Sequence, residues 1–115
     1  MTGDETVVTM TTHEGVPVVR LHGDLDEENV HDLDRLLAAA AAEGSTRTVV
    51  DLSRAHFVDS SVLHALLDAH AAHERAGAVL VLAGPLHVPV RRLFEVTGTA
   101  PAFRMADSLE AAITW

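Results

Sequence analysis

The stretch that decides the fold is VVDLSRAHFVDSSVL, residues 49–63. Residues 47–52, which include Val49 and Val50, predict a short buried strand. A loop then leads to Asp59 and Ser60, and from Ser60 onward apolar residues recur at the spacing of a helix. Ligand sites in α/β sheets favour such strand-to-helix junctions, although Asp59 or Ser60 can also serve simply as a helix cap.

The rest of the chain alternates between strand and helix patterns on both sides of this segment. The expected elements are, in order, strands at 6–12 and 16–22, a helix that starts at Asp26 or Asn29 and ends at Gly44, the strand at 47–52, a helix from Ser60 to Gly77, a strand at 78–83, a helix at 90–97, a strand at 102–105 and a helix at 107–114. The first two strands are expected to form an antiparallel hairpin, in which Pro17 marks a strand end or an edge. The order predicts one α/β domain over residues 1–115, with a mostly parallel sheet after the hairpin and a flexible tail at residues 1–5.

Composition excludes several classes of function. The 115-residue chain has a net charge of −9, only eight cationic side chains (all arginine) and 3% aromatic residues. These values disfavour binding to nucleic acid or to an anionic membrane surface. The chain has no cysteine, which excludes disulfides, zinc–thiolate sites and thiol catalysis. Because no apolar run is long enough to span a bilayer and the first residues do not resemble a signal peptide, we expect a cytoplasmic protein.

Three segments resemble STAS domains of the anti-sigma factor antagonist type. LHGDLD at residues 21–26 resembles the family's L-x-G-[ED]-L-D, and residues 49–63 resemble its hydrophobic-D-L stretch followed by D-S-S-G-L. VRRLFEVTG at residues 90–98 is similar to V-x-R-L-[FL]-x-x-[ST]-G. The segments occur in the family's order and at its distances, so the resemblance covers essentially the whole chain. It implies one mixed sheet with the helices mainly on one face.

The resemblance also implies regulation by partner exchange. Ser60 matches the serine that is phosphorylated by a partner, which is both a serine kinase and an anti-sigma factor. The unphosphorylated antagonist binds this partner and frees a sigma factor, the phosphorylated form lets go, and a serine phosphatase resets it. Asp26, Asp59, Ser61 and Val62 would line the docking surface, and Asp59 would orient the Ser60 hydroxyl or help the partner's active site. The chain would be no enzyme and would bind no cofactor, since ATP belongs to the kinase, and it would be a monomer or a weak dimer.

The sequence departs from the family pattern directly after the two serines. Family members usually carry glycines there, whereas this chain has Val62 and His64. These side chains would fill a space into which a partner backbone can approach closely. His64 follows Ser60 by four residues, one helical turn along the same face, and we expect it to hydrogen-bond a phosphate on Ser60. Such a phosphate would add about −1.5 to −2 charges at a helix N-terminus, which tolerates an anion.

Two other functional interpretations of these and nearby residues are weaker. Asp59, Ser60 and His64 could suggest a hydrolase triad, but adjacent Asp and Ser side chains rarely orient that way and no G-x-S-x-G elbow is present. Arg91 and Arg92 could contact phosphate, but two arginines are a weak nucleic-acid signal in a chain of net charge −9.

Metal binding is also disfavoured. His70 and His73 are three residues apart with Glu74 beside them, but no H-E-x-x-H pattern is present. His70 falls on the apolar stripe of its helix, which predicts a packed histidine, whereas His73 and Glu74 are expected to face water. The acidic residues between 24 and 34 lack the spacing and glycine of a calcium-binding loop and are expected to be solvated. The family resemblance favours a partner surface at the first of them, especially Asp26.

Other members of the same family leave alternatives open. The chain could be the STAS subunit of a lipid-transport ABC complex, which would copurify with an ATPase. It could be a stressosome-like scaffold, which would usually carry an additional N-terminal sensor domain. A third alternative, suggested by Val62 and His64, is a degenerate antagonist that binds its partner but is phosphorylated inefficiently.

Overall fold

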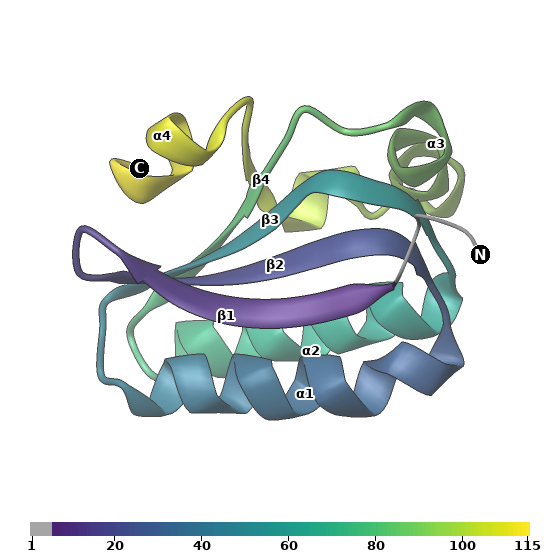
Figure 1. The fold of residues 1–115 in the computed structure, drawn as a ribbon. Coiled ribbons are helices and arrows are strands. Elements are labelled where there is room, and N and C mark those ends of the chain that lie inside the picture. Colours follow the sequence, from purple (N-terminus) through teal and green to yellow (C-terminus); the bar gives the residue numbers. More distant parts are fainter. Residues whose placement is uncertain (1–5) are drawn as a thin grey trace.

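The backbone follows the expected alternation of strands and helices around a single five-stranded sheet (Figure 1). A computed structural model describes residues 6–115, so the tail expected at residues 1–5 lies outside the described residues. The elements are β1 (Val7–His13), β2 (Val16–Leu25), α1 (Glu27–Ala42), β3 (Arg47–Val58), α2 (Ser60–Arg75), β4 (Val79–Ala83), α3 (Val88–Thr97), a 3₁₀ turn (Ala100–Ala102), β5 (Arg104–Ala106) and α4 (Leu109–Ile113).

The sheet is mixed, as predicted, with the strand order β1-β2-β3-β4-β5. β1 and β2 pair antiparallel through a tight turn at Glu14 and Gly15, both of which have positive φ. Every later neighbour pairs parallel. Pro17 lies on an interior strand, but it precedes Val18, the first β2 residue paired with β3, so its missing N–H removes no bond from that ladder.

β2 and β3 are longer than the sequence pattern suggested. The expected strands ended at residues 22 and 52, whereas the observed ones run side by side to the paired residues Leu25 and Val58. The pairing is interrupted by two register shifts, and Gly23, with φ of 94°, lies at one of them. Because Leu25 and Val58 are both buried in the core, the extended pairing continues the hydrophobic face of the sheet.

The helices lie mainly on one face of the sheet, as the resemblance implied. α1 and α2 run side by side across that face (Figure 1), and the main core between them and the sheet also receives Val90 and Phe94 from α3. A smaller core lies on the opposite face, where Ala112 and Ile113 of α4 pack on the strands. No helix in residues 6–115 has both the length and the apolar character that crossing a membrane requires.

The C-terminal elements are shifted from their expected positions. The strand predicted at 102–105 begins at Arg104, after a 3₁₀ turn, and ends at Ala106. The last helix begins at Leu109 rather than at residue 107, because Ser108 caps it: the Ser108 hydroxyl oxygen accepts the N–H of Ala111 at 3.1 Å.

Arg47 fixes this last helix against the sheet. Its guanidinium donates to the carbonyl oxygens of Ile113 at 2.8 Å and Trp115 at 2.6 Å. Replacing it (Arg47→Ala) is expected to lower the free energy of unfolding by about 1–2 kcal/mol, since hydrogen bonds from a charged donor are lost. Urea denaturation monitored by circular dichroism measures the change.

Arg35→Ala is the matched control for this prediction. Arg35 makes an exposed ion pair with Asp32, so its removal is expected to change stability by no more than about 0.5 kcal/mol. Equal stability losses in the two variants would show that the contacts of Arg47 do not stabilise the fold.

Candidate functional site

The N-termini of α1 and α2 meet at one edge of the sheet. The parallel strands β2 and β3 end together, at Leu25 and Val58, and each is followed by an aspartate that caps the next helix. The backbone N–H of Asp59 donates to the carbonyl oxygen of Leu25 at 3.2 Å, which joins the two turns. The carboxyl ends of parallel strands are where α/β folds carry their binding sites. The structure therefore brings together Asp26 and the 59–61 segment, which the sequence had indicated separately.

Asp26 caps α1 in a capping box. Its carboxylate accepts the N–H of Glu28 at 2.9 Å, while its own N–H donates to the side-chain oxygen of Asn29, also at 2.9 Å. Asp24, Asp26, Glu27 and Glu28 are all exposed. The edge is therefore strongly acidic beside the start of α2.

Asp59 caps α2 and holds its first turn. One carboxylate oxygen accepts the N–H groups of Ser61 at 3.0 Å and Val62 at 3.2 Å and also the hydroxyl of Ser61. Burial alone raises the pKa of Asp59, but the Ser61 hydroxyl and nearby backbone N–H groups outweigh that effect. The pKa of Asp59 therefore lies below its ordinary value, and the carboxylate is ionised at neutral pH.

The two serines after Asp59 differ in exposure and in hydrogen bonding. Ser61 is half-buried, and its hydroxyl donates to the Asp59 carboxylate. Ser60 is exposed at the first position of α2, and its hydroxyl makes no hydrogen bond to any residue in the described range 6–115. The expected contact between Asp59 and the Ser60 hydroxyl is therefore made by Ser61 instead. This arrangement leaves the Ser60 oxygen open to an incoming group.

Val62 and His64 point in different directions. The side chain of Val62 is completely buried and belongs to the main core, so the expectation that it lines a docking surface is wrong. A helix places successive residues about 100° apart, and Val62 falls on the inward stripe with Leu63 and Leu66. His64 is exposed, one turn after Ser60.

The sequence pattern did not reveal an apolar hollow next to this site. The α3 groove, as we name it, has a volume of about 340 Å³ and lies between the end of β3 and helix α3; its lining residues are Phe57, Val58, Asp59, Pro89, Arg92, Leu93 and Val96. Phe57 was expected in a loop. Because β3 continues to Val58, with Ala55 and Val58 facing the core, Phe57 faces outward and is 47% exposed.

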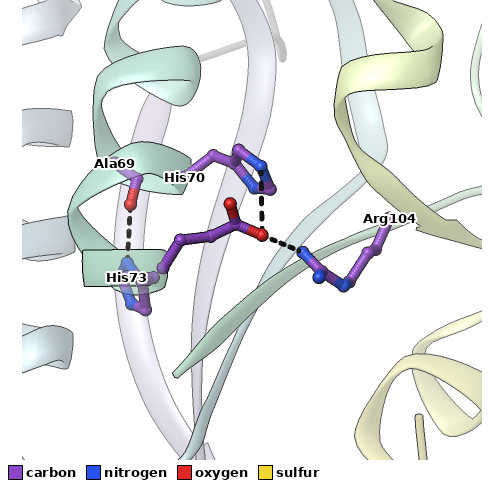
Figure 2. A network of polar contacts seen from close by, with 5 residues as sticks. Ala69, His70, His73 and Arg104 are labelled. Carbon is purple, nitrogen blue, oxygen red and sulfur yellow. Dashed lines mark hydrogen bonds and ion pairs between the residues drawn. The ribbon is translucent and has the colours of Figure 1, made fainter. Parts of the chain in front are cut away.

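His70 and His73 of α2 make two separate sets of polar contacts (Figure 2). His73 was expected to face water, but it is buried, and its two ring nitrogens contact the carbonyl oxygen of Ala69 at 2.8 Å and the Thr48 hydroxyl at 2.9 Å. His70 lies 3.8 Å from a Glu74 carboxylate oxygen, which also accepts a hydrogen bond from Arg104. Within residues 6–115 there is no group of three or more histidine or acidic side chains that could hold a metal ion.

Comparison with known proteins identifies the fold family. The model of the STAS domain matches residues 7–112. The chain belongs to the STAS domain family.

Several relatives of this STAS domain are named as anti-sigma factor antagonists. BtrV of Bordetella bronchiseptica, named as a candidate anti-sigma factor antagonist, is 32% identical over 105 residues, which cover 91% of this chain and 90% of BtrV. The crystal structure of an anti-sigma factor antagonist from Mycobacterium paratuberculosis superimposes with a TM-score of 0.81 at 25% identity, covering 98% of this chain and 95% of that one. The antagonist SpoIIAA, solved in its unphosphorylated form, superimposes with a TM-score of 0.68 at 26% identity, covering 92% and 91% of the two chains.

The cap at Asp59 makes stability depend on pH. Because the pKa of Asp59 is lower in the folded than in the unfolded chain, the ionised carboxylate stabilises the fold. This contribution is complete above the pKa of an unfolded aspartate, about 3.9, and is lost as the pH falls through the lower pKa of the folded state. Asp59→Asn retains a capping side chain but no charge, so we expect it to be less stable than the parent chain at pH 7, with the difference narrowing in acid. Urea denaturation at pH 7 and pH 3 measures the difference.

Two further variants show how large and how specific the stability change in Asp59→Asn is. Asp59→Ala removes the cap altogether and is expected to cost about 1 kcal/mol at neutral pH. Asp68→Asn removes an exposed charge from the middle of the same helix and should change little. A difference between the parent chain and Asp59→Asn that stays constant with pH would contradict the role of the ionised carboxylate.

Proposed function

We propose that this chain is an anti-sigma factor antagonist whose binding to its anti-sigma factor is controlled by phosphorylation of Ser60. The observation that carries the proposal is the exposed hydroxyl of Ser60 at the first position of α2, which makes no hydrogen bond to residues 6–115 and lies beside a Ser61 hydroxyl that is held by Asp59. The names of the relatives support the general role, and SpoIIAA, to which the chain is 26% identical, has also been solved in a phosphorylated form.

The proposed cycle needs two partners. The unphosphorylated chain binds an anti-sigma factor that is also a serine kinase. The anti-sigma factor then releases the sigma factor that it held, and this sigma factor can direct transcription. The kinase transfers phosphate from its own ATP to Ser60, and the phosphorylated chain dissociates until a serine phosphatase restores the hydroxyl. The chain acts in the cytoplasm as a binding protein, without catalysis of its own.

The geometry explains why phosphorylation changes binding and leaves the fold intact. Ser60 points to solvent at a helix N-terminus, where an added anion is stabilised by the helix dipole. The Asp59 carboxylate already accepts the N–H groups of Ser61 and Val62, so the cap does not depend on the phosphate. A dianion at Ser60 would, however, have to lose its water when a partner covers the adjacent apolar α3 groove.

The proposed docking surface contains four of the side chains that the sequence indicated around Ser60. Asp26, Asp59, Ser61 and His64 remain in this proposal, since each is exposed or half-buried at the edge where α1 and α2 begin. Val62 does not, because its side chain lies in the core.

The phosphorylation site is tested on protein purified from its own host. Intact-mass and phosphopeptide analysis is expected to find one phosphate, on Ser60, and Ser60→Ala is expected to abolish it. Ser61→Ala tests the neighbouring hydroxyl: since Ser61 also lies on the docking surface, only the position of the phosphate is compared, and it should remain on Ser60, because the Ser61 hydroxyl is engaged by Asp59. Phosphate on Ser61, or no phosphate under any growth condition, would contradict the proposal.

His64 is proposed to contact the phosphate. A charged imidazole one turn from Ser60 favours the phosphate dianion, so His64→Ala is expected to raise the second pKa of phosphoserine toward its usual value of about 6. A ³¹P NMR titration of the phosphorylated chain measures this pKa. His31→Ala, which removes an exposed histidine of α1, is the control, and an unchanged pKa in His64→Ala would rule out the contact.

A further inference from the structure

The α3 groove exposes an aromatic side chain in a protein that has few of them. The chain contains three phenylalanines. Phe94 and Phe103 pack edge to face in the core with ring centroids 5.5 Å apart, whereas Phe57 is 47% exposed. Val96, on the opposite wall, is 78% exposed. Exposed apolar side chains that gather around a hollow are typical of interaction surfaces.

The groove is continuous with the edge that carries Ser60. Asp59 lines the groove and also caps α2, so the hollow ends one residue from Ser60. On its other side, Phe57 of β3 pairs with Asp24 of β2, which begins the exposed acidic run of the β2–α1 turn. Apolar side chains therefore lie directly beside a run of exposed carboxylates.

We propose that the α3 groove receives an apolar side chain of the anti-sigma factor, flanked on the partner by arginine or lysine residues that face Asp24 and Asp26. This inference rests on the proposed function and names the chemistry of the partner surface at the same site. Central apolar anchors in a hollow, surrounded by polar contacts, carry most of the affinity of protein interfaces. The acidic rim selects a basic partner and steers its approach.

Charge argues against a second copy of this chain as the occupant. The chain has a net charge of −9, and a copy seated on the groove would bring further carboxylates toward the acidic rim. Like charges placed across an interface disfavour binding. A basic partner has no such cost.

Two valines of helix α3 provide a matched test. Val96 lines the groove, whereas Val88 is 57% exposed on the same helix and does not line it. Isothermal titration calorimetry with the purified anti-sigma factors of the host is expected to show binding of the parent chain to one of them. Val96→Glu should then weaken binding by about tenfold or more, and Phe57→Ala by about fivefold, whereas Val88→Glu should stay within about twofold of the parent. Circular dichroism and unfolding midpoints are expected to be unchanged for Val96→Glu, because its side chain is exposed.

The outcomes separate this inference from the proposed function. Parent-like affinity of both Val96→Glu and Phe57→Ala, or equal weakening by Val88→Glu and Val96→Glu, would overturn the groove while leaving the antagonist role standing. Concentration-dependent self-association of the parent chain that Val96→Glu abolishes would make a second copy the occupant and also overturn it. Failure of the parent chain to bind any anti-sigma factor of its host would overturn both.

Discussion

The parallel pairing of β2 and β3 to their last residues is the constraint on which the site depends. It places Leu25 beside Val58 and allows the Asp59 N–H to reach the Leu25 carbonyl oxygen. Two helices then begin next to each other at this end of the sheet, each capped by an aspartate. If either strand ended earlier, Asp26 and Ser60 would not share an edge. The long pairing is itself maintained by burial, since Leu25 and Val58 close the end of the main core.

At the start of α2, Asp59 and Ser61 form the helix cap, and the neighbouring Ser60 takes no part in it. The Asp59 carboxylate accepts the N–H groups of Ser61 and Val62, and the Ser61 hydroxyl donates to the same carboxylate, so this cap does not involve the side chain of Ser60. A residue that the fold does not need can change its charge at little cost to stability. The same edge combines an acidic rim with an apolar groove, so a charge added at Ser60 alters the surface that a partner would cover.

Element order and family could be read from the sequence, because both rest on local periodicity and on motifs with fixed spacing. The ends of β2 and β3 could not, since Gly23 and the polar residues Ser53 and Arg54 resemble breaks in a strand. The strands continue there because Gly23 pairs with Ala55 and Arg54 with His22. The orientation of side chains near helix faces was equally beyond local patterns. His73 is polar but buried because Thr48 on β3 offers it a partner, and Val62 turns inward because the core lies there. Phe57 was missed for the same reason, since its exposure follows from the length of β3.

The central claim is that the state of Ser60 controls partner binding through the surface and not through the fold. The most direct measurement compares the affinity of the host anti-sigma factor for the unmodified chain and for a chain carrying phosphoserine at position 60, with the unfolding midpoint of each form. The account predicts that phosphorylation weakens binding by about tenfold or more, which corresponds to about 1.4 kcal/mol, while the midpoints agree closely. Equal affinities, or a phosphorylated chain that unfolds at a much lower midpoint, would contradict it.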